Sequence, residues 1–286
     1  MRNFASKKAG ARVRTKITTA LLASAVALLC GTEANAGGKL TFQDNFDTLS
    51  LWDGHTGTWG TDFWYDPLNG PGNTLENNGE QEWYINSNFP LTQGVKPWTT
   101  TKDGKLILKG RHAPKKIQSL ISNYKYTSGE LNSYHSFSQT YGYFEMRAKL
   151  PTTQGVWPAF WLLPADGSWP PEIDIMEVLG NSPTTLYTSA HSQQNGKEVD
   201  YGTQVTVPDT SQDYHTYACD WEADYITWYF DGKQVYKLAT PPDMHKPMFI
   251  EVNLALGGNW GGKVDGTTMF PSNMFVDYIR VYSSKP

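Results

Sequence analysis

The chain has 286 residues, in which 28 acidic residues outnumber 24 basic ones. The resulting net charge of −4 argues against a surface that binds nucleic acid or an anionic membrane, since both require excess positive charge. The length is sufficient for one large domain with its own hydrophobic core.

The first 36 residues have the pattern of a secretory signal peptide. Six basic residues among the first sixteen precede an apolar run over 19–29, and Ala34-Asn35-Ala36 is a small-x-small cleavage site. The run is shorter than the ~20 residues that a membrane-spanning helix needs. We therefore expect cleavage after residue 36, secretion to the periplasm or the medium, and no membrane attachment of the mature chain.

Removal of 1–36 takes away six basic residues and one acid, so 37–286 would carry a net charge of −9. Cys219 would be the only remaining cysteine, which leaves no intramolecular disulfide despite export. The aromatic-rich segment 52–67, WDGHTGTWGTDFWYDP, allows two interpretations. Its rings could belong to the core, or they could form a sugar-binding groove in which pyranose faces stack on aromatic side chains.

Residues 37–286 contain no repeat, charge block or linker, so we expect a single domain. Short segments with strand alternation follow one another, separated by Gly, Pro, Asn and Asp, and Asp231-Gly232 is a hairpin signal between two of them. This pattern predicts an all-β sandwich of two antiparallel sheets. The predicted strands lie within 39–46, 104–111, 141–150, 185–192, 215–221, 225–230, 233–239, 248–256 and 274–282.

The segment 141–151, YGYFEMRAKLP, has one polar and one apolar face. Glu145 and Arg147 point to one side of such a strand, whereas Phe144 and Met146 point to the other. The polar face could be a solvated outer surface, or it could belong to a concave sheet that binds a polymer.

The segment 170–180, PPEIDIMEVLG, places Glu172, Asp174 and Glu177 among apolar residues. Regular alternation would turn Glu177 away from the other two acids. A β-bulge at Ile175 or Met176 would bring all three carboxylates to one face. From the spacing alone, three interpretations remain open: catalysis, a divalent-cation site, or a solvated face.

The pattern suits catalysis if the two glutamates converge to about 5–5.5 Å, the separation found in retaining glycosidases. One carboxylate then attacks the anomeric carbon, and the other, protonated, donates to the departing oxygen. The negative charge of Asp174 between them can keep one partner protonated near neutral pH.

The run over 141–180, which includes YGYFEMRAKLP, WPAFWLLP and EIDIME, closely resembles glycoside hydrolase family 16. The resemblance extends over 40–283 and implies a concanavalin-like β-jelly-roll with a concave substrate cleft. The longer, bulged form of the motif resembles the laminarinase-type branch, which includes depolymerases of bacterial exopolysaccharides. It implies that Glu172 is the nucleophile, Glu177 the acid/base and Asp174 an assisting residue.

The resemblance also implies a set of residues that contact the substrate. Trp157 and Trp161 match the W-P-A-F-W element, although either could be core, and Trp169 matches an aromatic that stacks on the sugar next to the scissile bond. His191 occupies a position facing the leaving group, and a structural histidine is its alternative. The remaining candidates are Glu145 and Arg147 on the cleft face, Glu80 in NNGEQEWY, and Asn253, Asn259 and Trp260 in VNLALGGNWGG.

Many family members bind a structural calcium ion through an aspartate of the last strand, and Asp277 matches it, with a plain surface acid as the alternative. The reaction needs no cofactor. We therefore expect a monomeric, secreted, retaining endo-β-glycanase that cleaves internal β-1,3 or mixed β-1,3-1,4 linkages of a β-glucan or glucose-rich exopolysaccharide. A transglycosylase and a non-catalytic carbohydrate-binding protein are the alternatives.

Overall fold

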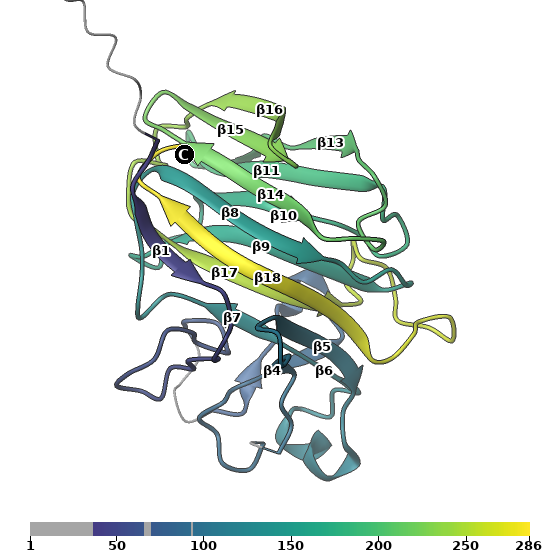
Figure 1. Ribbon diagram of the computed structural model, residues 1–286. Helices are drawn as coiled ribbons and strands as arrows, with labels where there is room; N and C mark the ends of the chain where they lie inside the picture. Colours follow the sequence, from purple (N-terminus) through teal and green to yellow (C-terminus); the bar gives the residue numbers. More distant parts are fainter. Residues whose placement is uncertain (1–36, 66–69, 93) are drawn as a thin grey trace, which may run out of the picture. The chain divides into compact units, whose positions relative to one another are not determined.

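A computed structural model describes residues 37–65, 70–92 and 94–286 (Figure 1). The predicted signal peptide lies outside the described residues. Residues Gly37–Pro286 form one compact unit. Among the described residues, we find no helix whose length and hydropathy would allow it to cross a membrane.

The larger sheet has eleven strands, nine of which pair in one continuous order. That order is β16 (Lys233–Ala239), β15 (Tyr225–Phe230), β14 (His215–Trp221), β8 (Gly142–Lys149), β18 (Ser272–Tyr282), β5 (Leu106–His112), β6 (Tyr126–Ser128), β3 (Glu82–Ile85) and β2 (Gly72–Asn73). In addition, β1 (Leu40–Asp44) pairs with β18, and β4 (Trp98–Thr100) pairs with β5. The pairing is antiparallel except between β3 and β6, which run parallel.

The smaller sheet has seven strands and is antiparallel throughout. Its order is β12 (Lys197–Asp200), β11 (Thr185–Gln194), β10 (Glu172–Glu177), β9 (Val156–Pro164), β17 (Met248–Leu256) and β7 (Glu130–Asn132), and β13 (Thr203–Thr206) pairs with β11. Two short 3-10 helices, η1 (Glu76–Asn78) and η2 (Lys115–Leu120), lie in connections. The all-β prediction is confirmed.

The core lies between the two sheets and consists of the apolar side chains that alternate along each strand and point inward. In Figure 1, β14, β8 and β18 lie in front of β10, β9 and β17. Phe144 and Met146 of β8 are fully buried and join one apolar cluster with Phe160, Ile173 and Val252 of the smaller sheet. Each such side chain contributes about 1.5–3 kcal/mol by leaving water, so these faces stabilise the sandwich without a disulfide.

A β-bulge interrupts β10, as its sequence requires. Against β9, Asp174 pairs with Trp161 but Met176 already pairs with Phe160, which leaves Ile175 as the extra residue. The same shift is present against β11, between Asp174 and Glu177. The bulge reverses the alternation, so all three carboxylates of β10 point to one face of the sheet.

Candidate active site

A cleft of about 1170 Å³ lies over the face of the smaller sheet that is turned away from the core. Side chains of β9, β10, β11 and β17 form its floor, and Glu172, Asp174 and Glu177 all line it. The walls include residues 63–65, 74–78, 80 and 202–204. The bulge thus brings the three acids together in one solvent-accessible depression.

A donor from a neighbouring side chain orients each of the three carboxylates. Trp169 Nε1 donates to Glu172 Oε2 at 2.7 Å, and Trp157 Nε1 donates to Glu177 Oε1 at 3.0 Å. Ser189 Oγ, on the adjacent strand β11, donates to Asp174 Oδ2 at 2.6 Å. Both indoles line the cleft, so each can hold a carboxylate while its ring remains available to a sugar.

His191 lies opposite Glu172 on β11, and among the described residues that line the cleft it is the only Lys, Arg or His side chain. Its Nε2 is 3.1 Å from Asp174 Oδ2 and 3.9 Å from Glu172 Oε1, and its Nδ1 is 2.9 Å from Glu198 Oε1. Burial by itself lowers the pKa of His191, but the Asp174 hydrogen bond and the surrounding carboxylates outweigh burial and raise the pKa to about 10. The ring is therefore a cation at neutral pH.

That charge state bears on the divalent-cation interpretation of the same residues. Ligand atoms of Glu172, Asp174 and His191 lie within 4.8 Å of one another, which is close enough for a metal ion. An imidazolium, however, has a proton on both nitrogens and no lone pair for a metal. The geometry thus favours an internal ion pair between His191 and the carboxylates.

The environments of the two glutamates make them unequal. Burial raises the pKa of both Glu172 and Glu177 well above the ordinary glutamate value, and the charge of Asp174 raises both further. The positive charge of His191 is the leading cause that opposes this rise at Glu172, whereas at Glu177 it comes after the Trp157 hydrogen bond. Both environments favour the protonated form, and because His191 opposes it more at Glu172 than at Glu177, the proton is favoured on Glu177.

The predicted aromatic residues of β9 and of the flanking loops reach the cleft. Trp157, Trp161, Trp169 and Trp260 all line it. Trp169 and Trp260 are 57% and 40% exposed, as stacking platforms require, whereas Trp161 is buried at 8%. Trp161 Nε1 donates to Asn253 Oδ1 at 2.9 Å, so Asn253 fixes the orientation of this indole on the cleft floor.

The segment 77–80 and the segment after β17 hold each other in place. Glu80 lines the cleft but is nearly buried, and it accepts hydrogen bonds from Asn78 Nδ2 at 3.0 Å and Tyr84 OH at 3.2 Å. Asn259 does not line the cleft, and its side chain donates to the Asn77 carbonyl at 3.4 Å. Asn259 thus supports the loop that carries Glu80, and its contact with a sugar stays a prediction.

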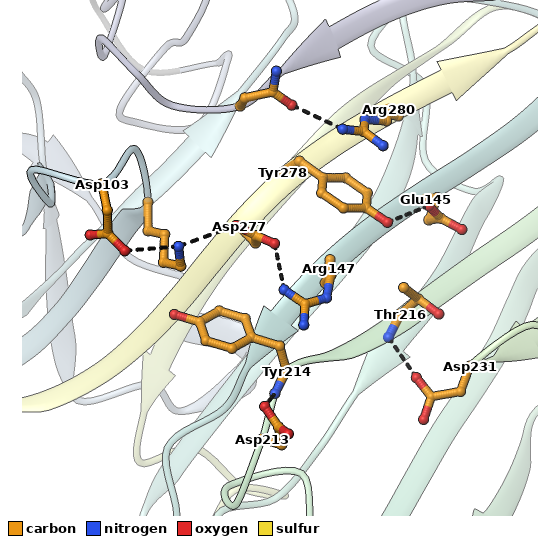
Figure 2. Close-up of polar contacts among 12 residues, drawn as sticks. Asp103, Glu145, Arg147, Asp213, Tyr214, Thr216, Asp231, Asp277, Tyr278 and Arg280 are labelled. Carbon is orange, nitrogen blue, oxygen red and sulfur yellow. Dashed lines mark hydrogen bonds and ion pairs between the residues drawn. The ribbon is translucent and has the colours of Figure 1, made fainter.

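The prediction that Glu145 and Arg147 lie on the cleft face is wrong. They lie on β8 of the larger sheet, and Figure 2 shows them on its outer face. Tyr278 OH donates to Glu145 Oε1 at 2.8 Å, and Arg147 pairs with Asp277. The alternation was predicted correctly, but the polar face of this strand belongs to the sheet opposite the cleft.

The surroundings of Asp277 do not fit the predicted calcium ion. Arg147 Nη1 donates to its Oδ2, and Lys105 Nζ lies 3.5 Å from its Oδ1 (Figure 2). Lys105 also pairs with Asp103 at 2.9 Å. Two cationic side chains already neutralise this carboxylate, and a divalent cation beside them would be repelled.

Several residues that line the cleft were missed by the sequence predictions. Tyr187 of β11 packs edge-on against Trp260 at 4.7 Å, and Glu198 and Asp200 come from β12. Trp64 and Tyr65 also line the cleft, so part of the aromatic-rich segment lies where the groove interpretation places it. A local signal for β12 was overlooked: Asn195-Gly196, both at positive φ, form the two-residue turn that joins β11 to β12 and brings Glu198 beside His191.

Comparison with known proteins agrees with this geometry. The family described as Glycosyl hydrolases family 16 matches residues 87–280. Endo-1,3-1,4-beta-glycanase ExsH of Rhizobium meliloti is 47% identical over 85% of this chain and 51% of its own length, so the chain spans about half of this relative. A beta-glucanase of Rhodothermus marinus is 36% identical over 63% of this chain and 68% of its own length.

The fold is shared with solved laminarinases. The laminarinase catalytic domain of Thermotoga maritima superposes with a TM-score of 0.71 at 30% identity, covering 87% of this chain and 100% of that domain. This likeness confirms the predicted jelly-roll. From the family match over most of the chain, the shared fold and the bulged carboxylate strand, we conclude that the protein belongs to glycosyl hydrolase family 16.

Proposed function

We propose that the protein is a retaining endo-β-glycanase that hydrolyses internal β-1,3 or mixed β-1,3-1,4 linkages by double displacement. The observation that carries this proposal is the bulge at Ile175, which gathers Glu172, Asp174 and Glu177 on the floor of an open cleft. An open cleft accepts a polymer along its length and so suits cleavage at internal bonds.

In the first step, Glu172 attacks the anomeric carbon and Glu177 donates its proton to the departing glycosidic oxygen. Because His191 stabilises the negative charge of Glu172, this residue suits the nucleophile, and Glu177 suits the acid. Trp169 Nε1 holds one oxygen of Glu172, which directs the other toward the sugar. The bond to the leaving oxygen breaks as a glycosyl ester forms on Glu172.

In the second step, Glu177 accepts a proton from water, and this water releases the sugar from Glu172. The negative charge of Asp174, held by Ser189 and His191, opposes full ionisation of the pair and so returns the proton to Glu177. No step uses a metal ion.

The names of the relatives support a glucan substrate. ExsH is an endo-1,3-1,4-beta-glycanase, and the Thermotoga maritima domain is a laminarinase. The exposed rings of Trp169 and Trp260 offer the flat apolar surfaces on which glucosyl units stack. We extend the proposal to a glucose-rich bacterial exopolysaccharide, and to export of the protein as a monomer after cleavage at residue 36.

The direct test is release of reducing ends by residues 37–286 from laminarin, mixed-linkage glucan, cellulose and a succinoglycan-type exopolysaccharide. The Glu172→Gln variant is the matched control. Release from at least one polymer, absent in the variant and with retained anomeric configuration in early NMR spectra, is expected. Inverted products, or equal activity of the variant, would contradict the mechanism. Transfer to added oligosaccharide in place of hydrolysis would identify a transglycosylase.

A further inference from the structure

His191 is held from two sides by carboxylates of different strands. Asp174 of β10 faces its Nε2, and Glu198 of β12 faces its Nδ1. β12 is the outermost strand of the smaller sheet, and Glu198 pairs in register with Gln193 rather than with His191. The Glu198 side chain must therefore reach diagonally across the sheet to contact the ring.

The protonation state of His191 follows from the groups that face it. Glu172 and Asp174 face it from β10, and on β12 Glu198 contacts it and Asp200 lies opposite it in register. Hydrogen bonds from both ring nitrogens to carboxylates require the imidazolium form. Without Glu198, Nδ1 would have no carboxylate within hydrogen-bonding distance among the described residues, and the ring could rotate or lose its proton.

We propose that Glu198 is a positioning residue that fixes His191 as an imidazolium, with Nε2 directed at Asp174 and toward the nucleophile Glu172. This inference rests on the proposed function for its effect on turnover. Glu198 does not touch the reacting atoms in this role. It acts through His191, whose charge stabilises the ionised form of Glu172 and opposes the repulsion from Asp174.

A different role for Glu198 would be a direct sugar contact, because it lines the cleft and its side chain is 43% exposed. The two roles predict different kinetic effects. Loss of a sugar contact raises KM and leaves the pH profile unchanged. Loss of the His191 anchor lowers kcat and moves the acidic limb of the pH profile to higher pH, because Glu172 then takes up a proton more readily.

The experiment compares the wild type with Glu198→Gln, Glu198→Asp and the charge-matched control Glu222→Gln, which lies outside the cleft. The titration of His191 is followed by NMR of its ring nitrogens, with His191→Gln used to assign the signals. In Glu198→Gln we expect the pKa of His191 to fall by about one unit or more. Because the ring is then free to turn Nε2 away from Glu172, we expect kcat to fall about tenfold to a hundredfold. We expect Glu198→Asp to retain part of the raised pKa of His191 and part of kcat, and Glu222→Gln to match the wild type.

An unchanged His191 titration in Glu198→Gln would overturn the proposal, and so would an increase in KM alone. Circular dichroism of each variant separates these effects from misfolding. If the wild type hydrolyses none of the polymers, the proposed function fails, but the NMR titration still reports whether Glu198 holds the charge of His191.

Discussion

Two groups of acids share one face of the smaller sheet but differ in their charged partners, their hydrogen-bond donors and their access to solvent. The open cluster consists of Glu172, Asp174 and Glu177 on β10. The sealed pair consists of Glu130 on β7 and Glu251 on β17, and both residues are fully buried. Asp174 and Glu251 even lie in one row across the sheet, since each pairs with Trp161 from opposite sides.

The difference lies in the partners and in access to solvent. The open cluster has the His191 cation, two indole donors and a cleft above it. Neither Glu130 nor Glu251 forms an ion pair with a basic side chain of the described residues. Their mutual hydrogen bond raises the pKa of Glu251 and lowers that of Glu130, so Glu251 is the donor and Glu130 the acceptor.

Burial raises the pKa of Glu130 and Glu251 well above the ordinary value, and the charge of a neighbouring acid adds to it: Asp62 for Glu130 and Glu130 for Glu251. At least one of the pair is therefore neutral when folded. A carboxylate on this sheet becomes reactive where a cation and an opening accompany it, and otherwise it stays protonated and structural.

The largest expected effect separates the two groups directly. Glu172→Gln should lower turnover by about 10⁴-fold or more, because no other side chain replaces the nucleophile. Glu251→Gln should leave turnover within about twofold of the wild type. Initial rates of the two variants on the polymer that the wild type hydrolyses fastest measure these effects. A comparable loss of turnover in both variants would contradict the distinction between the open cluster and the sealed pair.

The role of Glu177 as the general acid is tested by changing the leaving group of the substrate. Glu177→Gln should lower polymer hydrolysis by about 10³-fold, because the departing sugar oxygen then receives no proton. With an aryl glycoside, whose leaving group needs no protonation, the formation of the glycosyl ester should be nearly normal. A burst of released phenol is the measurement, and its absence would argue against this role.

The sealed pair is tested by stability. The raised pKa values mean that the folded chain keeps a proton that the unfolded chain loses above about pH 4.5, so stability falls as pH rises from there toward the folded pKa. Glu251→Gln has no such proton to lose. It should be more stable than the wild type at pH 8 by about 1 kcal/mol or more, with little difference at pH 4. Urea unfolding at both pH values checks this, and a lower stability at pH 8 would contradict it.

A smaller effect should follow the loss of one donor in the open cluster. Trp169→Phe keeps an aromatic ring but removes the hydrogen bond that lowers the pKa of Glu172. The acidic limb of the pH profile should move to higher pH, and kcat at neutral pH should fall about tenfold. Trp260→Phe is the control, because its indole donates to neither glutamate. Trp260→Phe should weaken polymer binding without moving the acidic limb of the pH profile.

No effect is expected from chelation. Lys105 and Arg147 neutralise Asp277, so EDTA should change the melting temperature by less than about 1 °C and leave turnover unchanged. Differential scanning calorimetry before and after dialysis tests this. A marked decrease in melting temperature, restored by calcium, would show that a metal ion takes part in this ion-pair group.

The sequence identified most of the longer strands and the acids, but it missed short strands such as β7, β12 and β13 and placed other residues less well. The odd offset between Asp174 and Glu177 required a bulge, and the register confirms it at Ile175. The polar face of β8 was equally clear from alternation, yet its assignment to the cleft was wrong. Alternation separates the two faces of a strand, but it carries no information on which of the two sheets bears the cleft.

By itself, the sequence determined the all-β class, the three carboxylates of β10 and the aromatic residues beside them, because alternation, the bulge and the family motif are local patterns. Only the tertiary structure decided that Glu145 faces away from the cleft and that Glu251 is sealed. Each of these outcomes depends on which distant strands pair and which loops cover them, and such non-local packing leaves no mark in a short stretch of residues.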